Sequence, residues 1–194
     1  MDLVVATETH TSTTPGDSAA GVIFVMSEIW KQNLKYQSEV NSRINIHEFQ
    51  ANPTDITIIG IYAPCSKNKD KFKKFMVELK KTILAVNQRN MILIMGDFNA
   101  KIRRNSEKSG IWNIHMVSDE RGVAMEKLFN ELDLKLVSSN FTPRRHVRVH
   151  QNIWERIKKK RKYMSSYQKS NSINPNAKSQ IDHVLCNSRW SSSV

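Results

Sequence analysis

Cysteine is scarce in this 194-residue chain, which holds only Cys65 and Cys186. Two cysteines are too few for a disulfide framework, and they lack the paired spacing of a zinc site. Both fall in or beside predicted strands, so we expect two buried free thiols and a reducing compartment.

Long apolar runs and a secretory signal are also missing. No apolar stretch reaches the length that spans a membrane. At the N-terminus no basic region precedes an apolar stretch. The sequence therefore predicts a nuclear or cytoplasmic protein that is not secreted.

Acidic residues are few, because 18 Asp and Glu stand against 30 Lys and Arg and leave a net charge of +12. Such an excess favours nucleic acid first and an acidic membrane surface second. Between residues 144 and 162 lie nine basic residues and one acid, a net charge of +8. This segment is either a nucleic-acid-binding arm or a solvated, partly disordered insertion, with equal weight, and Lys158–Lys162 has the composition of a nuclear import signal. Its basic residues are Arg144, Arg145, Arg148, Arg156, Lys158, Lys159, Lys160, Arg161 and Lys162.

Apolar periodicity predicts strands interleaved with two amphipathic helices, which is typical of a layered α/β or α+β domain. The length suits a single domain over residues 1–194, with the basic insertion at about 144–178. The helices are predicted at Lys69–Val86 and Glu120–Leu132, the latter capped by Ser118 or Asp119. Strands are predicted at Asp2–Thr7, Gly21–Met26, Arg43–His47, Ile56–Tyr62, Met91–Met95, Leu134–Val137 and Gln180–Cys186.

The segment Met91–Ala100 is the most informative part of the chain. Five apolar residues predict a buried strand, and Gly96 then releases the backbone into a loop that carries Asp97 and Asn99. Two residues apart on an extended backbone, these side chains can point the same way. Placing them there is costly unless something polar binds. The alternative interpretation is a simple turn, which the residue types alone favour.

Other polar residues stand at strand ends too. Glu8 follows the first strand, Tyr62 ends a strand before Ala63-Pro64, and Asp182 sits inside a late strand after Ile181. Together with Asp97, these residues indicate a polar site at one end of a sheet.

Three ordered motifs carry a resemblance to a known family. Ile59–Pro64, Ile94–Ala100 and Ile181–Leu185 resemble the endonuclease/exonuclease/phosphatase (DNase I-like) superfamily. They are most similar to the apurinic-type endonuclease domain of LINE-type (non-LTR) retrotransposons and of craniofacial development protein 2-like relatives. Asp119–Gly122 and Gly21–Val25 are also similar to that group. The resemblance implies a four-layer α/β/β/α sandwich, incomplete because the family's first strand and last segment are missing.

The resemblance also implies an activity, namely Mg²⁺-dependent hydrolysis of phosphodiesters in DNA, with Mn²⁺ as a substitute and no small-molecule cofactor or membrane partner. Glu8 matches the family's metal-binding glutamate, and Asp97 matches the carboxylate that activates the attacking water. Asn99 and Tyr62 match the groups that hydrogen-bond the phosphate, and Asp182 matches the acid that orients a catalytic histidine. The basic residues of the segment 144–162 would contact the DNA phosphate backbone.

Several family features are missing from the sequence. The catalytic histidine belongs to a Ser-Asp-His triplet, which this chain lacks, and the metal-binding asparagine of the family's first strand is also absent. His183 is not a substitute, since strand neighbours point to opposite faces, and we expect it to be a packed strand histidine. The loop from Glu8 to Gly21 is short enough to have lost a strand. The sequence thus predicts a truncated nuclease with weak or no activity.

The same sequence supports other interpretations. One is a non-catalytic, nucleic-acid-binding remnant of a retroelement endonuclease. Another is a marginally folded product without a selected function. A phosphatase ranks lower, because the motifs and the positive charge favour DNA.

Overall fold

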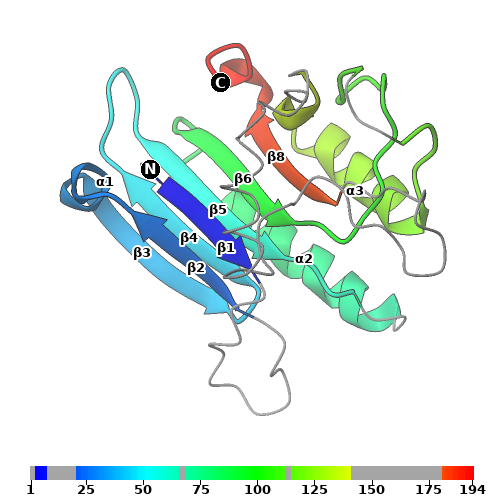
Figure 1. Cartoon of the computed structure of the whole chain (residues 1–194), viewed down its shortest axis with the longest axis horizontal. Helices are drawn as coiled ribbons and strands as arrows, with labels where there is room; N and C mark the ends of the chain where they lie inside the picture. Colours follow the sequence, from blue (N-terminus) through cyan, green and yellow to red (C-terminus); the bar gives the residue numbers. More distant parts are fainter. Residues whose placement is uncertain (1–2, 8–20, 66–68, 112–114, 141–180) are drawn as a thin grey trace, which may run out of the picture.

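The computed structural model describes residues 3–7, 21–65, 69–111, 115–140 and 181–194 (Figure 1). Glu8 and the basic segment 144–162 lie outside these ranges. The predictions made for them, including the insertion at about 144–178, therefore stay predictions.

Two β-sheets form the centre of the molecule. The larger is six-stranded, and β5 and β6 are parallel while its other neighbouring strands are antiparallel. Its order is β3 (Leu34–Asn41), β4 (Ile44–Phe49), β5 (Ile56–Tyr62), β6 (Met91–Asp97), β8 (Asp182–Asn187) and β7 (Leu134–Leu136). The smaller sheet pairs β1 (Leu3–Thr7) with β2 (Val22–Met26).

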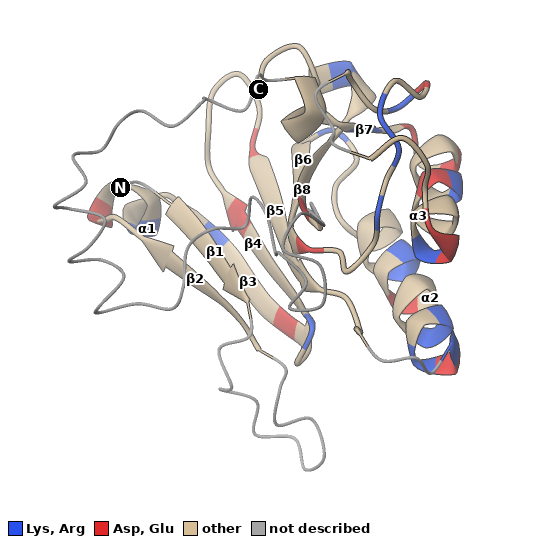
Figure 2. Cartoon of the chain, turned by 45° about the vertical axis from the view of Figure 1, so that its right-hand side comes forward, with Lys and Arg blue, Asp and Glu red and all other residues tan. Residues whose placement is uncertain are grey.

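Helices cover one face of the larger sheet and the smaller sheet covers the other (Figures 1 and 2). The long helices are α2 (Lys69–Ala85) and α3 (Glu120–Glu131), while α1 (Glu28–Gln32) is short and follows β2. Short 3₁₀ turns at Val137–Asn140 and Ser188–Trp190 follow β7 and β8. The described residues thus form the α, β and β layers of the predicted four-layer sandwich. None of their helices has the length and apolar composition needed to cross a bilayer.

The main core lies between the larger sheet and the two long helices. α2 buries Phe72, Phe75, Leu79 and Ile83, whose spacing of three and four residues places them on one side of the helix. α3 buries Met125, Leu128 and Phe129 in the same layer, and its N-cap is Asp119, one of the two predicted caps. Both helices begin where the periodicity predicted and end one residue earlier.

The run Ile56–Tyr62 is covered on both faces, as its nearly continuous apolar sequence predicted. Gly60 lets the smaller sheet approach closely, because a Cβ there would lie 2.8 Å from Val22 Cγ1 and 2.9 Å from Phe24 Cε2. Val22 and Phe24 pack with Tyr62 in a second, small apolar cluster. The two sheets therefore meet beside Tyr62.

Three details correct the sequence-based predictions. β3 and α1 were not predicted at all. Cys65 is exposed, because the chain leaves the sheet after Tyr62, whereas Cys186 is buried and burial raises the pKa of its thiol to about 11. Asp182 is the first residue of β8 rather than an interior one.

Candidate active site at the end of the central strands

Three of the predicted site residues lie side by side on neighbouring strands. Tyr62 pairs in register with Asp97 across parallel β5 and β6, and Asp97 pairs with Asp182 across antiparallel β6 and β8. Paired residues project from the same face of a sheet. Here that face is the one covered by β1 and β2, because Tyr62 packs with Val22. The topology thus gathers a phenol and two carboxylates at one sheet end.

The site is largely enclosed, which strengthens the electrostatic effect of its polar groups. Tyr62 is only 4% exposed and Asp97 only 6% exposed, while Asp182 is partly exposed. Asp182 is therefore the more solvent-accessible of the two carboxylates.

Gly96 lies inside β6, where it pairs with Ile61 and His183, so the predicted release of the backbone into a loop at Gly96 is wrong and the strand continues to Asp97. The φ of Gly96 is +140°, a conformation that residues with a side chain rarely adopt, and a Cβ there would lie 2.0 Å from the carbonyl oxygen of Ile61. Glycine is required at this position both by its φ and by the close approach of β5.

Asn99 adopts a left-handed conformation with φ of 46°, so the expected extended geometry between Asp97 and Asn99 is wrong. Its backbone N–H donates to Asp97 Oδ1 at 2.8 Å, which closes a local turn. The side chain nevertheless faces β5, because its Nδ2 donates to the carbonyl oxygen of Ala63 at 2.8 Å. The turn interpretation is therefore confirmed, while the polar site stays a prediction.

The side-chain amide of Asn99 can still donate a hydrogen bond to a ligand. An amide nitrogen carries two hydrogens, and one of them is used by Ala63. Within the described residues, no hydrogen bond uses the second. The bond to Ala63 therefore fixes the amide plane while it leaves a second donor.

Sequence reasoning missed two arginines at this site. The Arg43 guanidinium lies 5.0 Å from the ring centroid of Tyr62, and its Nη1 donates to the Tyr62 carbonyl oxygen at 3.3 Å. Arg121 Nη1 donates to the carbonyl oxygen of Asn99 at 3.3 Å. Neither contact has a local sequence signal, because each joins residues that are 19 or 22 positions apart.

His183 is packed away from these groups, as predicted. Its side chain is 2% exposed and meets the edge of Phe98 with ring centroids 5.5 Å apart. Burial lowers its pKa to about 4. It lies on the helix-covered face of the sheet together with Leu185, opposite to the face that carries Tyr62, Asp97 and Asp182.

Solved structures share this architecture, although no protein-family model and no curated protein matches the chain. The endonuclease domain of TRAS1, a telomere-specific non-LTR retrotransposon, superposes with a TM-score of 0.59 at 15% identity, over 96% of this chain and 68% of that one. The AP endonuclease LMAP from Leishmania major gives 0.56 at 8% identity, over 98% and 63%. An endonuclease/exonuclease/phosphatase family protein from Leptotrichia buccalis C-1013-b gives 0.50 at 12% identity, over 96% and 59%.

The chain has the endonuclease/exonuclease/phosphatase fold. The fold predicted from the three motifs is thereby confirmed. The chain spans between 59% and 68% of the length of these three structures, so its activity, substrate and partners are matters for proposal.

At this end of the sheet, the carboxylates of Asp97 and Asp182 and the amide of Asn99 offer some of the oxygen ligands that a hard cation needs. Carboxylate and amide oxygens are the ligands that Mg²⁺ prefers. Among the described residues, however, no group of three or more His, Cys, Asp and Glu side chains could hold an ion. The predicted ligand Glu8 lies outside those residues, but it directly follows Thr7, which pairs with Val22 beside Tyr62. β1 therefore leads the chain to this end of the sheet.

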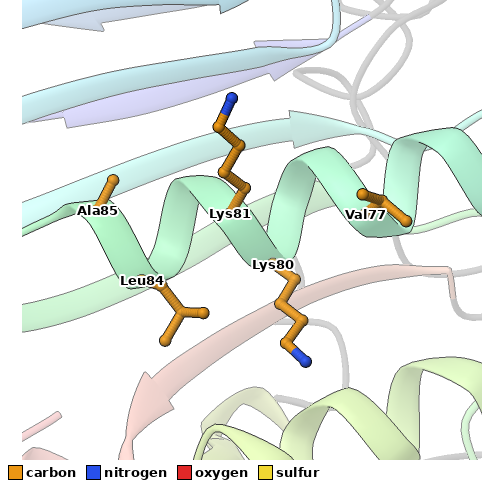
Figure 3. Close-up of a pocket in the computed structure, with 5 residues that line it drawn as sticks. All are labelled: Val77, Lys80, Lys81, Leu84 and Ala85. Carbon is orange, nitrogen blue, oxygen red and sulfur yellow. The ribbon is translucent and has the colours of Figure 1, made fainter.

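One surface depression lies elsewhere on the endonuclease/exonuclease/phosphatase fold. It follows the solvent side of α2 and is lined by Val77, Lys80, Lys81, Leu84 and Ala85 (Figure 3). Lys80 is ion-paired with Glu131 of α3. Because α2 covers the sheet face opposite to the Asp97 side chain, this depression is separate from the candidate active site.

Proposed function

We propose that this chain is a metal-dependent phosphodiesterase that acts on DNA, of the retrotransposon endonuclease type. The observation that supports it most is the in-register row of Tyr62, Asp97 and Asp182, with the fixed amide of Asn99 beside it. This set offers a base and hydrogen-bond donors at one enclosed point, which hydrolysis of a phosphodiester requires.

Each residue has a distinct part in the proposed reaction. Asp97 accepts a proton from the attacking water, whose oxygen bonds to phosphorus as one P–O ester bond breaks, and the leaving oxygen takes a proton from solvent. Asn99 Nδ2–H and the Tyr62 hydroxyl donate hydrogen bonds to phosphate oxygens on which negative charge builds. Arg43, beside Tyr62, adds positive charge near that point. Mg²⁺ or Mn²⁺ held by Glu8 would supply Lewis-acid stabilisation of the same charge.

DNA is the proposed substrate for two reasons. The fold neighbours include an endonuclease domain of a retrotransposon and an AP endonuclease. In addition, the net charge of +12 favours a polyanion. A nuclear or cytoplasmic location fits this proposal.

We expect the activity to be weak. Within these 194 residues no Ser-Asp-His triplet occurs, and a chain without that histidine would be a slow nuclease. Loss of one proton-transfer group typically costs about 10²–10⁴-fold in rate.

Nicking of supercoiled plasmid tests the proposal. We expect slow conversion to the open circle with Mg²⁺ or Mn²⁺, none with EDTA, and none for Asp97→Asn, which removes the base. Asp70→Asn, an exposed carboxylate at the start of α2, is the matched control and should nick like the parent. Equal nicking by Asp97→Asn and the parent would mean a contaminating nuclease, and no nicking by the parent would refute the proposal.

A second function is favoured by two sequence observations. The missing triplet and the net charge of +8 between residues 144 and 162 suit a protein that binds nucleic acid without cutting it. Salt-sensitive DNA binding without nicking would support this alternative over the enzyme.

A further inference from the structure

We propose that Arg121 is a positioning residue that holds the Asn99 amide in its phosphate-binding orientation. Its effect on catalysis rests on the proposed function, whereas its effect on the conformation of Asn99 does not. The motif Asp119–Gly122 thereby gains a role, because the first turn of α3 clamps the loop that leaves the active site.

The contact between Arg121 and Asn99 acts on a position with a left-handed backbone. Asn99 has φ of 46°, a region that asparagine tolerates better than other residues with a Cβ. Arg121 Nη1 donates to the carbonyl oxygen of this residue at 3.3 Å. A positively charged donor on that carbonyl favours the peptide orientation in which the Asn99 side chain reaches Ala63.

A second contact fixes the guanidinium itself. Arg121 Cζ lies 5.4 Å from the ring centroid of Phe72, which α2 buries against the sheet. Cation–π attraction places the planar group over that ring. Arg121 is half-buried, so the loop, α2 and α3 meet at one side chain. A lysine has no planar group that could stack on the Phe72 ring and donate to the Asn99 carbonyl oxygen at the same time.

The rest of the first turn of α3 holds the chain two residues beyond Asn99. Asp119 Oδ1 accepts from Lys101 N at 3.2 Å and from Gly122 N at 2.7 Å, while Asp119 N donates to Lys101 O at 3.1 Å. A Cβ on Gly122 would lie 1.9 Å from Lys101 O, so the helix rests directly on the loop backbone. The loop is thus held on both sides of Ala100.

Substitution of Arg121 tests the proposal in two ways. The first is NMR of the Asn99 side-chain amide, assigned by its disappearance in Asn99→Gly. In the parent, its two hydrogens should give well-separated resonances, because only one is bonded to Ala63. Arg121→Met, and to a lesser extent Arg121→Lys, should move them toward the positions of exposed asparagines. Arg189→Met is the matched control, since Arg189 is exposed and lies 5.6 Å from the Trp190 ring centroid, and it should change nothing.

The second readout is plasmid nicking. Arg121→Met should lower kcat about 10-fold or more and leave KM nearly unchanged, because misplacement of a catalytic group acts on the chemical step. In an Asn99→Gly background, the same substitution should have less than about a 2-fold further effect, because residues that act through one another are not additive.

Two results would overturn this role. One is an unchanged Asn99 amide spectrum in a folded Arg121→Met protein. The other is a full, multiplicative loss in the Asn99→Gly background, which would make Arg121 act independently of Asn99. If the parent does not nick DNA at all, the proposed function fails while the spectrum still decides whether Arg121 positions Asn99.

Discussion

Among single residues, Asn99 combines a proposed ligand group with a left-handed backbone, and two substitutions separate these properties. Asn99→Gly and Asn99→Ala both remove the amide, so each should lower the nicking rate by about 10²–10³-fold. A φ of 46° is unfavourable for alanine but not for glycine. The free energy of unfolding of the alanine variant should therefore be about 1–2 kcal/mol below that of the glycine variant. Nicking assays and urea unfolding measure the two effects. A glycine variant that nicks like the parent would show that the turn, not the amide, matters.

His183 links stability to pH. Burial lowers its pKa from 6.5 to about 4, so below pH 6.5 the unfolded chain binds a proton that the folded chain does not. Its contribution to stability is complete above pH 6.5 and is lost as the pH falls toward 4. This loss should amount to roughly 3 kcal/mol, since one pKa unit corresponds to about 1.4 kcal/mol.

Urea unfolding at pH 7.5 and 5 checks this expectation. His183→Leu, which cannot titrate, should flatten the pH dependence between these values. A residual slope will remain from His47, whose pKa burial also lowers. An undiminished slope in the variant would assign the titration to other groups.

Residue types at the site could be predicted from the sequence, but their conformations could not. An apolar strand followed by Gly96 was enough to single out Asp97 and Asn99. The orientation of the Asn99 side chain involves Ala63 and Arg121, which approach only in the folded chain. Arg43 was missed for the same reason, since nothing near it in sequence indicates a ring 19 positions away.

Among the strands, we expect Gly96 and Gly60 to tolerate substitution by alanine to different degrees. Gly96→Ala places a Cβ 2.0 Å from backbone of β5 at φ of +140°, and we expect a loss of about 3 kcal/mol or more, or no folding. Gly60→Ala meets side chains of the smaller sheet, which can shift, so about 1–3 kcal/mol is expected. Thermal and urea unfolding compare them. The reverse order would contradict the close contact of β5 and β6 at Gly96.

Elements with a strong period were predictable, and those without one were not. β5 and α2 show a continuous apolar run and a clear helical stripe, and their starts agree with the prediction. β3 was not predicted, because most of its residues face solvent and give no apolar pattern. It is an edge strand, paired only with β4 among the described strands. An edge strand tolerates polar side chains such as Lys35 and Gln37, because they face solvent.

For the whole molecule, the layered sheets explain why distant motifs converge. Strand order 5-6-8 brings together residues 62, 97 and 182, although β7 and α3 intervene in sequence. Periodicity alone indicated layers but not this order, because it carries no information on which strands are neighbours. The resemblance of three motifs to a known family predicted the layered sandwich, but the strand order is seen only in the structure.

Charge distribution gives the last prediction. If the segment 144–162 contacts DNA phosphates, replacing Lys158–Lys162 by neutral Gln should reduce affinity at least about 10-fold in 150 mM salt, because each lost phosphate contact lowers the salt slope by about 0.9. In the proposed reaction the chemical step depends on Asp97 and Asn99, so kcat should stay nearly unchanged. Fluorescence anisotropy with duplex DNA over a salt series measures the slope.

A matched control separates contact from overall charge. Five lysines of α2 lie on the helix-covered side of the molecule, opposite to the sheet face that carries the candidate active site. Four of them are exposed, and Lys80 is half-buried and ion-paired with Glu131, while basic residues of α2 are visible in Figure 2. Their replacement by Gln removes the same charge, so it should weaken long-range attraction but leave the salt slope nearly intact. Equal slopes for both variants would mean that net charge, not the segment 144–162, governs binding. The control lysines are Lys71, Lys73, Lys74, Lys80 and Lys81.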